Sequence, residues 1–333
     1  ALMHDYMVPP EDIEGHDLAT VQWKTEFDIT STLRDIGHNV HTLGVKDDLR
    51  DIMRTVDEFK PHIAFNLMEA FDEVGVFDMN IVSYLELIRL PYTGCNPRGL
   101  VLSRDKALSK QLMSYHQIPI PEFAVFRRDR DIKRPKRLKF PLIIKSLTQD
   151  ASIGIAQASV VDDDNKFRKR VQFIHDSIGT DAIAEQFIDG QELYVGIVGN
   201  ERLQAFPVWE LTFDSMPEGL HHIATDRVKW NETYQKKHGI KTGAAKDLSN
   251  GLSERIKRIA KHVYRSLGMS GYARMDLRLD RNGDFFIMEA NANPQLAFGE
   301  DLAESAEQAG LTYEELLQRI LQNGLRWHPE RPG

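Results

Sequence analysis

One segment near the C-terminal end, residues 272–294, constrains the fold of this chain more than any other. Its sequence, YARMDLRLDRNGDFFIMEANANP, predicts two short strands that are joined by a turn at Asn282 and Gly283. Because side chains alternate between the two faces of a strand, its polar residues should fall on shared faces. These residues are Arg274 with Asp276 on the first strand, and Glu289 with Asn291 on the second. A hairpin of this kind gathers two carboxylates, an amide oxygen and an arginine.

The polar residues of this hairpin have two interpretations. Carboxylate and amide oxygens that converge suit Mg²⁺ bound together with substrate phosphates. The alternative is a solvated surface, where acidic residues usually lie. In either case, a regular pleat would place Phe286 and Met288 on one side of the second strand, and Ile287 and Glu289 on the other.

The length and charge of the chain limit its organisation and its partners. With 333 residues it is too long for one compact core, so we expect two or three domains. Its 42 Lys and Arg against 50 Asp and Glu give a net charge of −8, which argues against nucleic acid and anionic membranes as partners. The sequence contains neither an apolar run of transmembrane length nor a signal-peptide pattern. The single cysteine, Cys95, suits a reducing compartment, and we expect a cytoplasmic protein.

The first 100 residues alternate helix-like and strand-like segments. Strands that alternate with helices indicate a parallel sheet, whose ligands bind at the carboxyl ends of the strands. That edge corresponds to Asn66, residues 68–76 and the loop that begins at His4. We predict helices over residues 21–36, 48–59 and 78–88, and strands over residues 38–43 and 62–67.

The remainder of the chain indicates antiparallel sheets with helices. Residues 122–190 predict a small α+β unit, and residues 191–330 predict further strands, including the hairpin. Helices are expected over residues 104–116, 163–177, 253–266 and 312–323, and strands over residues 141–145, 182–188 and a stretch that ends at Val161.

Lys145 and the loop after it form a second candidate site. A lysine at the end of an apolar strand can reach a phosphate, or it can extend its ammonium group to solvent at a strand edge. The loop 146–154 is small and polar, and its backbone N–H groups could face phosphates, although it matches no Walker motif.

Residues 185–192, EQFIDGQE, form a third candidate. Glu185 and the backbone near Phe187 could hydrogen-bond an adenine edge, and Glu192 could accept hydrogen bonds from ribose hydroxyls. An ordinary hinge between two domains explains the same segment equally well.

The order of these segments resembles the ATP-grasp superfamily and, within it, the D-alanine–D-alanine ligases. The resemblance extends over residues 60–310 and rests on residues 91–94, 104–106 with Lys110, 141–145, 152–154, 185–192, 274–276, and 289–291 with Pro294. It implies a three-domain ATP-grasp fold of the α/β (α+β) class. The N-terminal parallel α/β domain would be residues 1–100, and two α+β domains would clamp ATP, residues 101–190 with the phosphate loop 146–154, and residues 191–333.

The resemblance also implies roles for individual residues. Arg274, Lys229 and Ser152 would be catalytic, and Asp276, Glu289 and Asn291 would bind two Mg²⁺ ions, for which Mn²⁺ can substitute. The ATP-binding residues would be Lys106, Lys145, Ser152, Gly154, Glu185, Phe187, Ile188 and Glu192. In the family reaction ATP phosphorylates a carboxylate, ADP leaves, and an amine displaces phosphate from the acyl phosphate. The implied partners are small-molecule carboxylates and amines, and a second copy of the chain in a homodimer.

Departures from the family concern the substrates rather than ATP. Ala151 stands where a substrate-site serine is expected, Lys229-Trp230 replaces Lys-Tyr, and Gln295 replaces a glycine after Pro294. Glu300 replaces a serine that binds the acceptor's carboxylate, and it would repel such a group. Glu300, Asp301 and Glu304 suit an amine-bearing group, or they are a solvated helix start favoured by the helix dipole.

These observations predict an ATP-dependent carboxylate–amine ligase whose substrates are not two D-alanines, with Trp230, Gln295 and Glu300 in the substrate site. One alternative is a genuine D-alanine–D-alanine ligase. The other is a non-catalytic ATP-binding regulator, which would be expected to lack some of Arg274, Asp276, Glu289 and Asn291, all of which are present.

Overall fold

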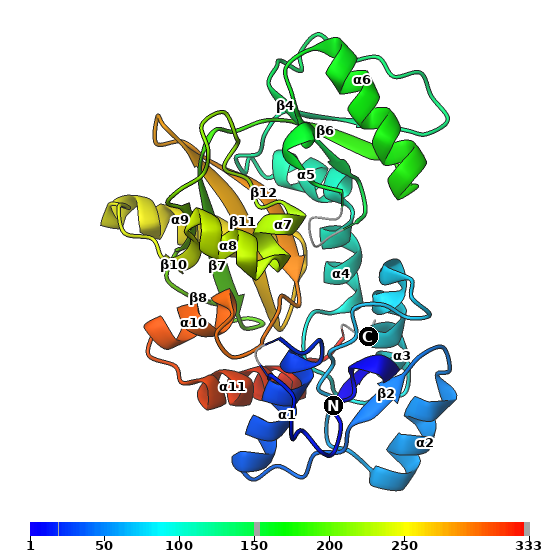
Figure 1. Cartoon of the computed structure of the whole chain (residues 1–333). Helices are drawn as coiled ribbons and strands as arrows, with labels where there is room; N and C mark the ends of the chain where they lie inside the picture. Colours follow the sequence, from blue (N-terminus) through cyan, green and yellow to red (C-terminus); the bar gives the residue numbers. More distant parts are fainter. Residues whose placement is uncertain (19, 150–153, 330–333) are drawn as a thin grey trace.

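The structure is a computed structural model that describes residues 1–18, 20–149 and 154–329. Three β-sheets follow one another along the chain, the first parallel and the other two antiparallel (Figure 1). This combination confirms the predicted α/β (α+β) class. The two boundaries between the predicted domains remain predictions.

The N-terminal region is built on short parallel pairings. β1 (Leu2–His4) pairs in parallel with β2 (Leu43–Val45), and isolated parallel bridges join Leu2 to Asn66 and Ala64 to Tyr92. The predicted strand over residues 62–67 therefore pairs in parallel, but only through single bridges. The helices of this region are α1 (Lys24–Asp35), α2 (Arg50–Phe59) and α3 (Asp78–Leu87), close to the predicted ranges.

The predicted strand over residues 38–43 is wrong for most of its length. β2 begins only at Leu43, and residues 38–42 have no regular structure. They lie beyond the first residue of β1, where the described chain offers no neighbouring strand, and His38, Asn39 and His41 are exposed.

Two consecutive helices connect this region to the rest of the molecule (Figure 1). α4 (Pro97–Arg104) was not predicted, and α5 (Lys106–Tyr115) matches the prediction. Both helices have side-chain caps, because the Asn96 side chain accepts from Gly99 N–H and the Asp105 carboxylate accepts from the N–H groups of Ala107 and Leu108. The caps fix where α5 begins, and therefore where Lys106 lies.

The central sheet has the strand order β3-β6-β4-β5 and packs against α6 through an apolar core around Phe126, Leu142 and Phe167. Its two inner strands, β4 and β6, place Lys145 and Glu185 as diagonal neighbours on one face of the sheet, because Lys145 is opposite Ile183 and Glu185 is opposite Ile143. The elements are β3 (Phe123–Phe126), β4 (Leu142–Ser146), β5 (Val160–Val161), α6 (Asp164–Phe173) and β6 (Ala182–Gln186).

The large sheet has the order β10-β9-β7-β11-β12, with β8 paired to the end of β7. One face carries Leu193, Val195, Met275 and Ile287, and it packs against α9 in the largest core of the molecule. The elements are β7 (Gly190–Val198), β8 (Gln204–Ala205), β9 (Trp209–Phe213), β10 (Ile240–Ala244), β11 (Tyr272–Asp280), β12 (Phe285–Ala292), α7 (Asp226–Trp230), α8 (Glu232–His238), α9 (Asn250–Ser266), α10 (Asp301–Gln308) and α11 (Tyr313–Arg326).

The predicted hairpin is confirmed as β11 and β12, but its pleat is not regular. Asp276 pairs with Glu289 and the next residue, Leu277, pairs with Ile287, so Met288 is an extra residue in a β-bulge. The bulge turns Ile287 into the core and Glu289 to the other face, whereas a regular pleat would have placed both on one side. This irregularity brings the Glu289 carboxylate opposite Asp276.

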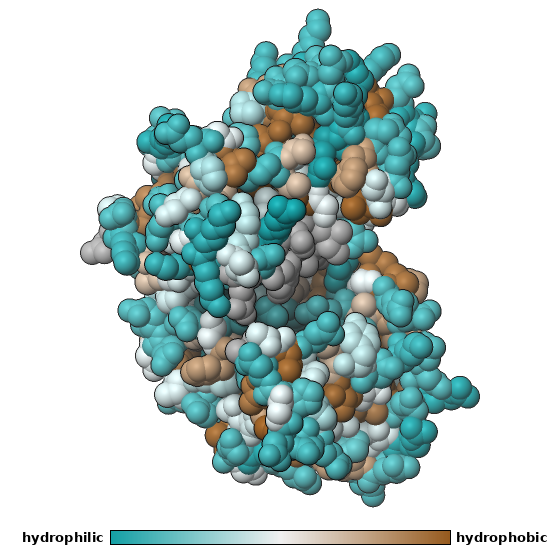
Figure 2. Space-filling view, in the orientation of Figure 1, coloured by the Kyte–Doolittle hydropathy of each residue, from teal (hydrophilic) through white to brown (hydrophobic). Residues whose placement is uncertain are grey.

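The molecule has three parts, the N-terminal region, the central sheet with α6, and the large sheet (Figure 1). In Figure 1 the central sheet and α6 lie above the large sheet, and the N-terminal region lies below, next to α10 and α11. Figure 2 shows mostly hydrophilic side chains on this face and an indentation at its right edge between the upper and lower parts. Among the described residues, no helix combines the length and the apolar character needed to cross a bilayer.

Candidate active site

A cavity lies between the central sheet and the large sheet, and four of the eight predicted ATP-binding residues line it, Lys106, Lys145, Phe187 and Glu192. Its apolar wall comes from both sheets and from the segment before α7, and its polar lining carries three lysines. It is lined by Lys106, Ile143, Lys145, Gln149, Ile155, Phe187, Glu192, Ile223, Ala224, Lys229, Asp276, Leu277, Arg278, Met288 and Glu289.

The floor of the cavity is the polar face of strands β7 and β11. In register, Arg278 lies opposite Glu192, and Asp276 lies opposite Tyr194. Because alternate residues of each strand share a face, Glu192 and Tyr194 of β7 point the same way as Arg274, Asp276 and Arg278 of β11. The opposite face is the apolar core under α9, so the sheet itself separates the charged groups from the core.

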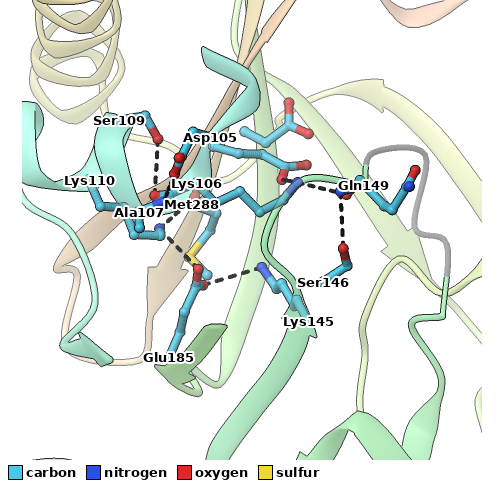
Figure 3. A network of polar contacts seen from close by, with 12 residues as sticks. Asp105, Lys106, Ala107, Ser109, Lys110, Lys145, Ser146, Gln149, Glu185 and Met288 are labelled. Atoms are coloured by element: carbon cyan, nitrogen blue, oxygen red, sulfur yellow. Dashed lines mark hydrogen bonds and ion pairs between the residues drawn. The ribbon is translucent and has the colours of Figure 1, made fainter. Parts of the chain in front are cut away.

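A buried ion cluster joins α5 to the central sheet (Figure 3). The Glu185 carboxylate lies 3.3 Å from the ammonium group of Lys110 and 3.3 Å from that of Lys145, and Lys110 also donates to Met288 O at 2.6 Å. Burial favours the neutral form of Glu185, but the two lysines outweigh it and lower the pKa of this carboxyl group. Burial lowers the pKa of Lys110 more than Glu185 raises it. For Lys145 the balance is reversed, because burial is outweighed by the charges of Glu185 and Glu289, and its pKa is raised.

Lys106 and Lys145 approach the cavity from different elements. Lys106 is the first residue of α5; its ammonium group donates to Gln149 O at 2.8 Å and lies 4.0 Å from the Glu289 carboxylate (Figure 3). Burial would raise the pKa of Glu289, but the charges of Lys106, Lys145, Lys229 and Arg274 lower it to about 2. Glu289 is therefore a fixed negative charge within a ring of cations.

Arg274 and Asp276 form a bidentate pair on the floor of the site. The Nε and Nη2 atoms of Arg274 donate to the two oxygens of Asp276 at 2.7 and 2.9 Å, and its guanidinium carbon lies 4.6 Å from the centre of the Tyr194 ring. Asp301 of α10 lies 3.7 Å from the same guanidinium group. Burial raises the pKa of Asp276, and the adjacent Glu289 adds to this effect, although the charge of Arg274 opposes both. The pKa of Arg274 is raised, because Asp276 outweighs the effect of burial.

The three predicted metal ligands meet at the end of the hairpin. Asp276 and Glu289 are register partners, and so are Arg274 and Asn291. The Nδ2 atom of Asn291 is buried and has no hydrogen-bond partner among the described residues. No group of three or more His, Cys, Asp or Glu side chains that could hold a metal occurs among the described residues, so a metal here would need the amide of Asn291 as well as the two carboxylates. Two carboxylates and one amide oxygen match the ligands that Mg²⁺ takes beside phosphates.

The other predicted nucleotide-binding residues have different settings. Phe187 lines the cavity, whereas Ile188 and Glu185 are buried beside it and do not line it. The Gly154 carbonyl accepts a hydrogen bond from Arg170 on α6, and a Cβ atom on Gly154 would lie 3.0 Å from Ile178. Ser152, predicted to be catalytic and to bind ATP, lies outside the described residues. So do Asp150 and Ala151 of the same loop.

The predicted substrate residues Trp230, Gln295 and Glu300, and the predicted catalytic residue Lys229, lie on or next to α7 and α10. Lys229 of α7 lines the cavity, and its neighbour Trp230 is the last residue of that helix. Gln295 is exposed. Glu300 is the N-cap residue of α10, but its side chain accepts no capping hydrogen bond. Burial and the adjacent Asp301 raise the pKa of its carboxyl group.

Two residues of the site were not assigned roles from the sequence. Arg278 lines the cavity and pairs with Glu192, and the Tyr194 hydroxyl donates to Glu192 at 3.0 Å. Arg278 lies two positions after Asp276, and Tyr194 lies two positions after Glu192, so each shares a strand face with a predicted site residue. That spacing was the signal in the sequence that could have found them. The pairing of Arg278 with Glu192 depends on the register between β7 and β11, which the sequence did not specify.

Comparison with known proteins agrees with this geometry. A sequence model of the family described as "D-ala D-ala ligase C-terminus" matches residues 112–322. The uncharacterized protein y4sG of Sinorhizobium fredii is 30% identical over 301 residues, which cover 88% of this chain and 85% of that protein. The D-alanine–D-alanine ligase of Bordetella avium is 30% identical over 249 residues, which cover 73% of each chain.

The fold is also similar to solved structures. The crystal structure of the D-alanine–D-alanine ligase from Bacillus anthracis, complexed with ATP, aligns with a TM-score of 0.71 at 21% identity over 91% of both chains. The ligase from Coxiella burnetii aligns with a TM-score of 0.63 at 20% identity, over 79% of this chain and 68% of that one. From the family match, the relatives and the shared ATP-grasp fold, we conclude that this chain belongs to the D-alanine–D-alanine ligase family and is a ligase that forms carbon–nitrogen bonds.

Proposed function

We propose that this ligase joins a small carboxylate to an amine through an acyl phosphate, with ATP as the phosphoryl donor and ADP and phosphate as products, and that its substrates are not two D-alanines. The observation that carries the proposal is the ring of cations around Glu289, in a cavity whose other wall is apolar. ATP and a substrate carboxylate both carry negative charge, and fixed cations allow them to approach each other.

Three of the four cations, Lys106, Lys145 and Arg274, can be given a part in this reaction. Lys106 and Lys145 come from the central part of the molecule and would hold phosphate oxygens, because both lie at the cavity and are anchored by Gln149 O and Glu185. Arg274 lies at the opposite end, near α10, and its planar donors suit the oxyanion that forms when an amine attacks the acyl phosphate. Phe187, with Ile143, Ile155 and Ile223, would hold the adenine ring.

Asp276, Glu289 and Asn291 would hold Mg²⁺ beside the phosphates, with Asn291 binding through its side-chain oxygen. The register of β11 and β12, which pairs Asp276 with Glu289 and places Asn291 two residues further along β12, supports this assignment. The bound metal would neutralise phosphate charge as the γ-phosphoryl group is transferred. Asp276 is paired with Arg274 in this structure, so the same carboxylate would have to share its oxygens between the arginine and the metal.

The proposal that the substrates differ from D-alanine rests on Glu300. Its carboxyl group is half-buried at the start of α10, next to Asp301, and Asp301 is close to Arg274. A negative group at this position favours an acceptor that carries an amine over one that presents a carboxylate. If Glu300 were only part of a solvated helix start, the acceptor would not depend on it.

The reaction is tested by measuring the phosphate that the protein releases from ATP in the presence of Mg²⁺. The purified protein should release phosphate with a particular pair of acid and amine, identified from pools of each, and mass spectrometry should find their amide. D-Alanine alone should give a much lower rate. A rate with D-alanine as high as with the best pair would instead identify a genuine D-alanine–D-alanine ligase. ATP binding without turnover on any pool would identify a nucleotide-binding regulator.

Glu300→Ser tests the acceptor site separately. We expect the ratio of kcat/KM between two competing acceptors to change by about tenfold or more in this variant. The reason is that a repulsion between like charges, or the loss of a paired contact, is worth roughly 1–3 kcal/mol. The affinity for ATP should stay unchanged. Equal losses in ATP binding and in acceptor use would show that Glu300 only supports the structure. Glu307→Ser, on the exposed part of the same helix, is the matched control.

A further inference from the structure

Arg278 is a buried cation in the floor of the cavity, and the proposed reaction gives it no role. Its side chain is 6% exposed, and its Nη1 atom donates to Glu192 Oε2 at 3.1 Å. The Nη2 atom donates to Gly190 O at 2.8 Å and to His222 O at 2.9 Å. A buried cation is costly unless it is paired, and three acceptors, one carboxylate and two backbone carbonyls, hold Arg278 in one place.

Those partners belong to two segments around the cavity, strand β7 with Gly190 and Glu192, and the segment of His222. Gly190 is the first residue of β7, directly after the link from the central sheet, and His222 lies in the segment before α7 that covers the apolar wall. The same segment is tied to the central part by Gln157, whose side chain bonds the backbone of His221 in both directions, at 2.8 and 2.9 Å. Arg278 thus joins the hairpin to the start of β7 and to the segment before α7.

Arg278 also fixes how Glu192 is presented. The Tyr194 hydroxyl donates to Glu192 Oε1 and Arg278 donates to Oε2, so each carboxylate oxygen already has one donor. A carboxylate oxygen can accept two hydrogen bonds, which leaves one acceptor site on each oxygen. Both Glu192 and Arg278 line the cavity, so these free sites are available to a pair of neighbouring hydroxyl groups.

We propose that Arg278 is a positioning residue that fixes the Glu192 carboxylate for the ribose of the nucleotide, and thereby sets the preference for ribonucleotides over deoxyribonucleotides. The inference rests on the proposed function, since that function requires ATP in this cavity. An arginine suits this position because its planar fork reaches three acceptors at once, whereas a lysine ammonium group acts as a single point charge. The guanidinium carbon lies 5.5 Å from the centre of the Phe187 ring, which keeps the cation beside the proposed adenine site.

The test is equilibrium binding of ATP and of 2′-deoxy-ATP, measured by calorimetry with Mg²⁺ present, so that no acid or amine is needed. The wild-type protein should bind ATP more tightly than 2′-deoxy-ATP. Arg278→Met should weaken ATP by about tenfold, the usual effect of losing a hydrogen bond to a charged group, and should weaken 2′-deoxy-ATP far less. The discrimination between the two nucleotides would then largely disappear. The discrimination shown by Arg278→Lys should fall between that of the wild-type protein and that of Arg278→Met. Glu192→Gln should lose as much discrimination as Arg278→Met.

Controls separate positioning from general support of the fold. Arg281→Met removes an exposed arginine of the same hairpin, which pairs with Asp189 at 2.8 Å, and it should leave both affinities unchanged. The double variant of Arg278→Met and Glu192→Gln should lose no more discrimination than either single change, because each single change already disrupts the same Arg278–Glu192 pair. If Arg278→Met does not fold, Arg278→Lys and Glu192→Gln carry the same comparison.

Two results would contradict the inference. An equal loss of affinity for ATP and 2′-deoxy-ATP in the Arg278 variants would make this residue a purely structural clamp. A wild-type protein that binds both nucleotides equally would show that Glu192 does not hold the ribose. Failure of the wild-type protein to bind either nucleotide would instead overturn the proposed function itself.

Discussion

The nucleotide end and the substrate end of this active site differ in how their charges are paired. At the nucleotide end, Lys110 and Lys145 share the Glu185 carboxylate, and Arg278 holds Glu192. The substrate end carries Gln295 and Glu300 and adjoins α1, the helix of Glu26, because Lys24 of α1 donates to Phe298 O at 2.6 Å. The acidic groups here are less completely paired. Glu300 does not cap its own helix, and the buried Oε2 atom of Glu26 has no hydrogen-bond partner among the described residues.

This difference indicates which part of the site is organised before ligands bind. Fixed and paired groups at the nucleotide end need no rearrangement to receive ATP, which is the condition for strong electrostatic stabilisation. At the substrate end, burial raises the pKa of the carboxyl groups of both Glu26 and Glu300. We therefore expect changes at the nucleotide end to disturb stability and ATP use, and changes at the substrate end to alter selectivity or pH dependence.

The largest expected effect is on stability, from Lys110→Met. Lys110 and Glu185 are both fully buried, and removal of one partner from a buried ion pair costs about 3–5 kcal/mol. Urea unfolding followed by circular dichroism measures the change. Lys166→Met is the matched control, because the Lys166–Asp162 pair is exposed and its loss should change the stability little. Equal effects of the two substitutions would remove the contrast on which the comparison rests.

The next effect is on catalysis, from Arg274→Met. Loss of a donor that stabilises a developing oxyanion lowers kcat by about 10²–10³-fold. The affinity for ATP should change much less, because Arg274 lies at the end of the cavity near α10. Steady-state phosphate release and nucleotide binding measure the two quantities. A variant that loses ATP affinity in proportion to kcat would place Arg274 at the nucleotide end instead.

A smaller effect concerns the pH dependence of stability and the Glu26 carboxyl group. Burial, with a contribution from Glu69, raises its pKa from 4.5 to about 7 in the folded protein. The folded state therefore binds more protons than the unfolded state between these pH values, and the contribution of Glu26 to stability falls as pH rises through that window. Glu26→Gln should have wild-type stability near pH 4 and should be more stable than wild type above pH 7. Thermal unfolding across this range measures the difference, and parallel curves for the two proteins would show that Glu26 ionises normally.

The sequence predicted the elements of the active site better than their contacts. The hairpin was predictable because polar and apolar residues alternate along the first strand, and an apolar run follows the turn at Gly283. The bulge at Met288 was not, because one extra residue in a strand leaves no local pattern when its neighbours are also apolar. The missed helix α4 did have a signal, an Asn96 cap followed by Pro97 as the first helical residue.

The roles of Glu185 and Arg278 show why the remaining contacts were missed. Glu185 was predicted to contact adenine, but its surroundings depend on Lys110 of α5 and Lys145 of β4, which only the tertiary structure brings together. Its predicted contact with adenine remains a prediction, because it does not line the cavity in this structure. Arg278 looked like an ordinary charged strand residue until the register of β11 with β7 placed it opposite Glu192.

The central claim is that an activated carboxylate is formed at the nucleotide end and passed to an amine at the substrate end. The most direct measurement labels the carboxylate oxygens of the preferred acid with a heavy oxygen isotope and follows the label by mass spectrometry of the released phosphate. Transfer through an acyl phosphate predicts that one labelled oxygen appears in phosphate for each amide formed. Unlabelled phosphate released in step with amide formation would contradict the account.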